Sequence, residues 1–131
     1  RAIGGDTWLA TIRIPAKLRA RLTAELPILS FKADTIKHSQ DRSTHKARLR
    51  LRDNKLIETV LLRPRSDLWT VCVSSQAGCA LGCSFCATGL MGFSRNLTSE
   101  EISDQILLWR QFMRRLNIAG RLTNVVFMGM G

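Results

Sequence analysis

The chain has 131 residues, the size of one domain, and 45% of them are hydrophobic, which excludes a disordered polyelectrolyte. No run of about 18 apolar residues and no apolar signal core occurs, so the sequence predicts neither a membrane span nor a secretion signal. The net charge is +10, and thirteen of the 20 basic residues lie within residues 1–55, which favours a polyanionic partner, nucleic acid first, over an anionic membrane or a merely basic surface.

The N-terminal part, residues 8–37, is predicted to be mostly helical. Pro15 suits a first helical turn, and Leu18 and Leu22 stand four residues apart on one face. Only one short amphipathic helix is clear, and the chain does not begin with Met. We therefore expect residues 1–37 to be the tail of a helical accessory domain in a longer protein.

A β-hairpin is predicted over residues 45–62, because apolar and basic residues alternate there. Asp53 and Asn54 both tolerate positive φ and would form a two-residue turn. We assign residues 38–66 to this hairpin extension. One face of its first strand is basic, and it is either a solvated outer face or a phosphate-contacting one; its residues are Lys46, Arg48, Arg50 and Arg52.

A strand over Leu68–Ser74 and a glycine-rich loop over Ser75–Asn96 follow. A loop of that length inside a compact domain is usually functional.

A helix is predicted from a capping box, Thr98 with Glu101, to about Asn117, where Gly120 can terminate it. A second strand follows at Leu122–Met128. Strand, helix and strand form one βαβ unit, which requires a parallel sheet. The apolar stripe of the helix indicates core packing: Ile102, Ile106, Trp109, Met113 and Leu116.

All four cysteines lie within residues 72–86, which indicates a metal or redox site in a reducing compartment. Cys79, Cys83 and Cys86 are spaced by four and three residues, directly after the first strand of the βαβ unit. Three thiolates leave one iron of a [4Fe–4S] cluster without a protein ligand. This spacing resembles the radical S-adenosylmethionine (SAM) superfamily, in which SAM binds that open iron.

Two other readings of the cysteines remain. A structural zinc site needs four ligands, and Cys72 would have to be the fourth although it lies in a predicted strand. A redox pair of Cys83 and Cys86 would leave Cys79 without a role.

The second strand ends in Gly129-Met130-Gly131. Radical SAM enzymes carry a glycine-rich motif at this point, whose backbone groups bind the SAM amino group. The position after the second strand gives weight to a motif that is weak on its own.

The chain resembles the RlmN/Cfr family of RNA adenine methyltransferases. The resemblance is dense from Ile57 to Gly131, and its main segments are residues 57–61, 72–89, 91–98 and 123–131. It implies the N-terminal portion of a partial (β/α)6 radical SAM barrel over residues 67–131, incomplete here, so that the 131 residues alone are expected to be inactive.

The resemblance also implies the chemistry. Family members methylate an adenine ring carbon of 23S rRNA, carbon 2 or carbon 8, through a methyl-cysteine intermediate, and the carbon-2 enzymes, which we favour, also modify some tRNA. It implies a [4Fe–4S] cluster, SAM, an electron donor such as flavodoxin, and a monomeric, cytoplasmic enzyme. A metal- or cluster-stabilised RNA-binding module without catalysis is the alternative.

The resemblance also implies roles for individual residues of this chain that match the family's site positions. Cys79, Cys83 and Cys86 would be the cluster ligands, and Cys72, seven residues before Cys79, would resolve a protein–RNA intermediate. The SAM contacts would be Phe85, near the adenine, and the backbone of Gly129, Met130 and Gly131. A small buried thiol is the alternative for Cys72, and loop packing is the alternative for Phe85.

Overall fold

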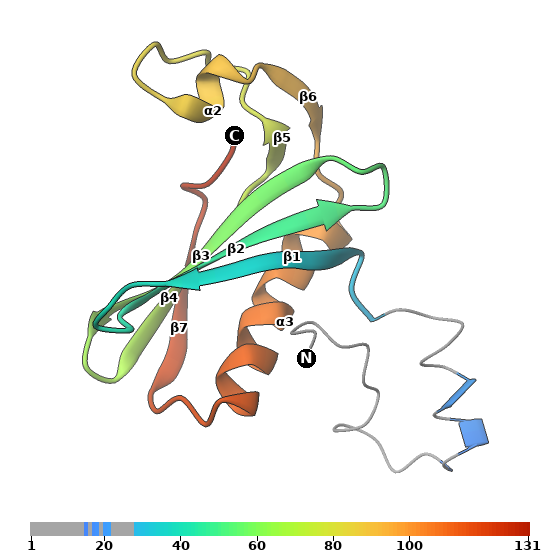
Figure 1. Cartoon of the computed structure of the whole chain (residues 1–131), viewed down its shortest axis with the longest axis vertical. Coiled ribbons are helices and arrows are strands. Elements are labelled where there is room, and N and C mark those ends of the chain that lie inside the picture. The colour runs from blue at the N-terminus through green and yellow to red at the C-terminus, as the bar shows by residue number, and fades with distance from the viewer. Residues whose placement is uncertain (1–14, 16, 19, 22–27) are drawn as a thin grey trace.

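The computed structural model describes residues 15, 17–18, 20–21 and 28–131. Figure 1 shows a twisted sheet with one long helix against it and a small lobe at one end. The strands and helices are β1 (Phe31–His38), β2 (Thr44–Leu51), β3 (Leu56–Arg65), β4 (Leu68–Cys72), β5 (Gln76–Gly78), α2 (Ala87–Leu90), β6 (Phe93–Asn96), α3 (Ser99–Arg115) and β7 (Arg121–Val126).

The main sheet has the order β1-β2-β3-β4-β7. Strands β1 to β4 pair antiparallel, and β7 pairs parallel to β4, with Cys72 opposite Val126. The predicted βαβ unit is therefore confirmed, and its two parallel strands continue a sheet that the hairpin strands have begun.

The predicted β-hairpin is confirmed as β2 and β3, but its turn is not the two-residue turn that we expected. Of the two turn residues, Asn54 alone has positive φ, at 65°. The Asn54 N–H donates to the Leu51 carbonyl, and the Leu51 N–H donates to Lys55. The loop therefore contains residues 52–55, and one left-handed residue suffices to close it.

The helical prediction for residues 31–37 was wrong, because this segment is the edge strand β1. Its register shifts between Ala33 and Thr35, which leaves Asp34 as the extra residue of a β-bulge. The bulge breaks the alternation of apolar residues, so Phe31 and Ala33 are followed by Ile36 on the inner side. Upstream, Lys17, Leu18, Ala20 and Arg21 are helical, and the remainder of the predicted helical segment before residue 28, Pro15 excepted, lies outside the described residues.

Helix α3 begins at the predicted capping box: the Thr98 side chain accepts from the Glu101 N–H, and the Glu101 carboxylate accepts from the Thr98 N–H. The helix ends at Arg115, and Asn117 just beyond it has φ 50°, while the Ile118 N–H donates to the Met113 carbonyl. This is a Schellman motif, so Asn117 takes the position that we expected for Gly120.

The core lies between α3 and one face of the sheet. Leu116, which we placed on the buried stripe, is exposed, whereas Leu108 and Phe112 are buried. The sheet and helix contribute these buried side chains, among others: Leu49, Ile57, Leu61, Trp69, Val71, Leu108, Trp109, Phe112 and Met113. In the described part of the chain, no helix has both the length and the apolar character to cross a membrane.

Candidate metal and cofactor site

Residues 79–92, called here the cysteine segment, project from the end of the sheet (Figure 1). Strands β5 and β6 form a narrow neck below it, and the Cys79 N–H closes the segment by donating to the Gly92 carbonyl at 3.1 Å. Gly78 has φ +81°, and a Cβ there would overlap the Gly92 carbonyl oxygen. The neck therefore requires glycine at 78. The sequence did not predict its short strands.

The three predicted cluster ligands lie on this one segment. Cys79, Cys83 and Cys86 are free thiols, each half-buried. The backbone N–H groups of Gly89 and Thr88 lower the pKa of the Cys86 thiol. Because the thiolate is the form that binds metal, this environment favours ligation by Cys86.

The donor chemistry fits an iron–sulfur cluster, since three accessible thiols share one segment and leave one iron for another ligand. Among the described residues, no three His, Cys, Asp or Glu side chains are grouped closely enough to hold a metal ion. The segment therefore supplies three ligands of the correct type for a three-cysteine site. Their thiol groups are not close enough together in this structure to coordinate one metal ion.

Cys72 lies at the end of β4, before the neck. Its side chain is buried, at 8% exposure, and burial raises the pKa of its thiol. Cys72 pairs with Val60 and Val126, and Thr59, the neighbour of Val60, bonds to Trp109 of α3. Since side chains alternate along a strand, Cys72 lies on the sheet face opposite α3.

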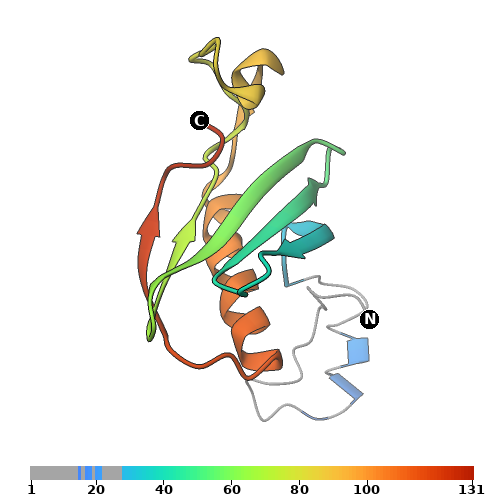
Figure 2. The ribbon, with the colours of Figure 1, turned by 60° about the vertical axis from the view of Figure 1, so that its left-hand side comes forward.

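The predicted glycine motif, residues 129–131, lies directly against the chain that leaves β4. The Met130 carbonyl accepts from the N–H groups of Ser75 and Gln76, at 2.9 and 3.0 Å, and the Met130 side chain is in the core. Gly129 is exposed, and a Cβ there would lie 2.5 Å from the Ser74 Oγ. Figure 2 shows the chain end beside the base of the lobe. The glycine motif and the cysteine segment thus share one end of the sheet.

Phe85 lies in the cysteine segment with 91% of its side chain exposed. Leu81, Leu90 and Met91 of the same segment are also exposed. The alternative reading of Phe85 as loop packing finds no support, because this ring is not covered by its own loop.

A buried polar network that the sequence analysis did not identify supports this end of the sheet. The Gln105 amide accepts from the Ser74 N–H and donates to the Ser74 carbonyl, both at 2.9 Å. The Ser74 Oγ accepts from the Met130 N–H at 2.9 Å and donates to the Glu58 carbonyl at 2.6 Å. Helix α3 thereby fixes the residue on which the glycine motif rests. Gln105 lies on the buried face of α3 but is polar, so hydrophobic periodicity gave no signal for it.

The basic face of β2 is largely paired. Arg48 and Arg50 both contact Asp34, at 2.6 and 3.3 Å, and Lys46 contacts Glu58 at 2.6 Å. Arg48 holds the pKa of the Asp34 carboxyl below its usual range, with Arg50 adding to the effect. These contacts favour the reading of this face as a solvated, ion-paired surface.

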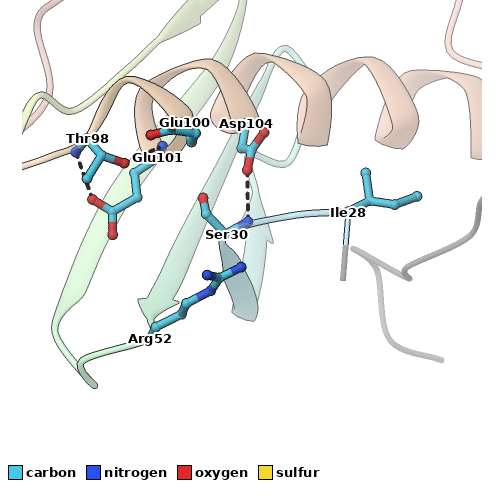
Figure 3. A pocket seen from close by; sticks show the side chains of 7 residues that line it. All are labelled: Ile28, Ser30, Arg52, Thr98, Glu100, Glu101 and Asp104. Atoms are coloured by element: carbon cyan, nitrogen blue, oxygen red, sulfur yellow. Dashed lines mark hydrogen bonds between the residues drawn. The ribbon is translucent and has the colours of Figure 1, made fainter. Parts of the chain in front are cut away.

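A cavity of about 550 Å³ lies at the start of α3 (Figure 3). Asp104 accepts there from the Ser30 N–H at 2.8 Å, and Glu101 accepts from Thr98. The lining residues are Ile28, Ser30, Arg52, Thr98, Glu100, Glu101 and Asp104. None of the predicted site residues lines this cavity.

No protein-family model matches the chain. It is 46% identical over 121 residues to the "probable dual-specificity RNA methyltransferase RlmN" of Chloroflexus aurantiacus, covering 90% of this chain and 32% of that protein. It is 44% identical over 114 residues to the dual-specificity RNA methyltransferase RlmN of Solidesulfovibrio magneticus, covering 87% and 32%.

A comparison with solved structures also gives a match. A crystal structure of a radical SAM methyltransferase from Sphaerobacter thermophilus matches with a TM-score of 0.77 and 43% identity, covering 91% of this chain and 34% of that one. The chain spans about a third of the length of the relatives it matches. Over most of its length, this chain is homologous to about one third of an RlmN dual-specificity RNA methyltransferase, and it has the fold of about one third of a radical SAM methyltransferase.

Proposed function

We propose that this chain is the cluster- and SAM-binding part of a radical SAM RNA methyltransferase of the RlmN type. The observation that supports it best is the presence of three accessible thiols and the glycine motif at one end of the sheet. The identity to RlmN proteins covers this region, since one alignment spans 100% of the chain.

Cys79, Cys83 and Cys86 would hold three irons of a [4Fe–4S] cluster. The segment would have to draw its thiols together for this, and metal binding commonly orders its own site. When bound, the cluster and SAM supply radical chemistry that side chains cannot perform. Lowering of the Cys86 pKa prepares one ligand in the unloaded protein.

The SAM contacts would be the backbone of residues 129–131 and the ring of Phe85. Gly129 is exposed, and Met130 is fixed by Ser74, Ser75 and Gln76, so the motif is held in place before SAM arrives. An exposed aromatic face can pack on an adenine ring.

Cys72 would be the thiol that resolves a protein–RNA intermediate. Its raised pKa keeps the proton on its Sγ at neutral pH, and a buried neutral thiol does not compete for iron. These properties separate Cys72 from the three proposed ligands.

The wider proposal follows the relatives. The substrate would be an adenine of 23S rRNA, methylated at carbon 2, and tRNA as well, with flavodoxin or a similar electron donor. The protein would be a cytoplasmic monomer. Because β1 pairs with β2, the predicted boundary at residue 37 moves to residue 30. Residues 1–30 would end a helical accessory domain, residues 31–66 would form an extension of three strands, and residues 67–131 would begin a partial (β/α)6 barrel.

The test is anaerobic reconstitution with iron and sulfide, in this chain and in a version extended to the length of the relatives. We expect about four irons per chain, lost on Cys79→Ala, Cys83→Ala or Cys86→Ala and retained on Cys72→Ala. The extended protein should cleave SAM reductively and methylate rRNA. Tightly bound zinc that is lost on Cys72→Ala would contradict the proposal and support a non-catalytic RNA-binding module.

A further inference from the structure

We propose that Arg95 is a positioning residue, which fixes the neck of the cysteine segment to the β2–β3 hairpin and to α3. It thereby sets the orientation in which the three thiols are presented. The relevance of that orientation to catalysis rests on the proposed function, whereas the contacts themselves do not.

The cysteine segment has no anchor of its own in the core. None of residues 79–96 is buried, and helix α2 contributes no buried side chain. The nearest residues of the hydrophobic core on either side of this stretch are Ala77 and Leu97. The direction of the segment is therefore decided at its neck.

Arg95 lies in that neck. It pairs with Ala77 across β5 and β6. Ala77 is two residues before the start of the cysteine segment, and Arg95 is three residues after its end. A side chain at this position is fixed relative to both ends of the segment at once.

The guanidinium of Arg95 donates four hydrogen bonds. Its Nε donates to the Asp53 Oδ2 at 2.8 Å, and its two terminal nitrogens donate to the two oxygens of Glu101 at 2.8 and 2.9 Å. Nη1 also donates to the Asn96 carbonyl at 3.1 Å. A fork-to-fork arginine–carboxylate pair fixes direction as well as distance.

The two carboxylates come from different parts of the fold. Glu101 is 6% exposed and belongs to the capping box of α3, so it cannot follow a moving arginine. Asp53 is at the exposed turn of the hairpin, 42 residues before Arg95 in the sequence. We call Arg95, Asp53 and Glu101 the Arg95 cluster. It connects the hairpin, the neck and the long helix at one point.

Hydrogen exchange of the full chain without a cluster tests the contact. In Arg95→Met, amide exchange across residues 79–92 should rise about tenfold or more while α3 keeps its protection, because only the neck loses a fixed partner. Arg95→Lys should restore part of the protection, since a lysine ammonium keeps the positive charge but cannot donate to both carboxylate oxygens in the planar, two-point manner of a guanidinium.

Arg48→Met is the control, because it removes another ion-paired arginine, which is 47% exposed against 31% for Arg95 and pairs with Asp34 on the sheet. It should leave residues 79–92 unchanged. Asp53→Asn removes only the exposed partner and should give an intermediate increase, even if Arg95→Met fails to fold. Equal exchange in Asp53→Asn and Arg48→Met would overturn the inference.

Reconstitution of the same variants separates the two proposals. If the wild-type chain takes up a cluster, Arg95→Met should bind it with an altered electron paramagnetic resonance signal or release it faster than Arg48→Met does. Identical signals and release rates would contradict the positioning role. Failure of the wild-type chain to bind iron would contradict the proposed function and leave the exchange result to decide the role of Arg95.

Discussion

His45 of β2 lies edge-on against Phe112 of α3, with ring centroids 5.0 Å apart, and neither of its ring nitrogens has a hydrogen-bond partner. The imidazole is 3% exposed and also contacts Trp69, at 5.7 Å. Burial lowers the pKa of His45, and the charges of His38, Arg42 and Arg63 act in the same direction, against a smaller opposing effect of the Arg42 backbone. The core therefore holds a neutral histidine.

We expect the protein to lose stability as the pH falls below about 6.5, the ordinary pKa of histidine. The unfolded chain binds a proton there, while folded His45 remains neutral, so protons favour unfolding. The free energy of unfolding should fall by up to about 1.4 kcal/mol per pH unit until the folded pKa is reached. Urea unfolding between pH 7.5 and 5.5 measures this loss, and His45→Phe should remove most of it. An unchanged pH slope in His45→Phe would show that another group is responsible.

The four thiols should differ in reactivity in the protein without a cluster. Cys86, with its lowered pKa and half-buried side chain, should be alkylated first, and Cys72, buried with a raised pKa, should be last. Timed iodoacetamide labelling and peptide mass spectrometry give the order. In denaturant the difference should disappear, and fast labelling of folded Cys72 would contradict the burial that separates it from the proposed ligands.

Replacement of Gln105 by Leu should destabilise the fold by about 2–3 kcal/mol, because the N–H and carbonyl of Ser74 would lose their partners in a buried site. Gln111→Leu is the control on the same helix, at a half-buried position, and should change stability by less than about 0.5 kcal/mol. Chemical denaturation measures both. Similar effects of the two substitutions would show that the network adds little to stability.

Asp34→Asn should increase non-specific RNA binding, since it releases Arg48 and Arg50 from their carboxylate. Each arginine that then reaches a phosphate should steepen the dependence of log affinity on log salt by about 0.7–0.9. The loss of these exposed ion pairs should change the stability of the fold little. Titration of a single-stranded RNA at several salt concentrations measures the slope.

Asp67→Asn is the charge-matched control, because this exposed side chain pairs with no arginine in the described part of the chain. It alters the net charge equally without releasing an arginine. If both substitutions increase binding to the same extent, net charge explains the change, and the basic face of β2 has no special part in it.

The sequence predicts the elements whose signals are local. The capping box at Thr98 marks the start of α3, and the alternation in residues 45–62 marks the hairpin. Strand β1 was missed because the bulge at Asp34 changes the phase of its apolar residues. Strands β5 and β6 were missed because they have three and four residues, too few for a periodic pattern.

Part of the candidate site can likewise be predicted from the sequence, and part cannot. The spacing of its three cysteines is visible in the sequence, since all three lie within residues 79–86. The contacts that support it are not visible, because they join residues far apart: Gln105 with Ser74, 31 residues away, and Arg95 with Asp53, 42 residues away. Polar pairs at such separations depend on the tertiary fold and leave no periodic trace.

The hydrogen bond between Cys79 and Gly92 has a practical consequence for protein engineering. Since the two ends of the cysteine segment already meet there, the residues between them can be exchanged for a short turn without altering the strands below. Such a shortened chain would keep the sheet, α3 and the Arg95 cluster while lacking two of the three proposed iron ligands, Cys83 and Cys86. Conversely, the segment is a cassette that can be transplanted between homologues as a unit, so that differences in cofactor behaviour can be traced to it or to its scaffold.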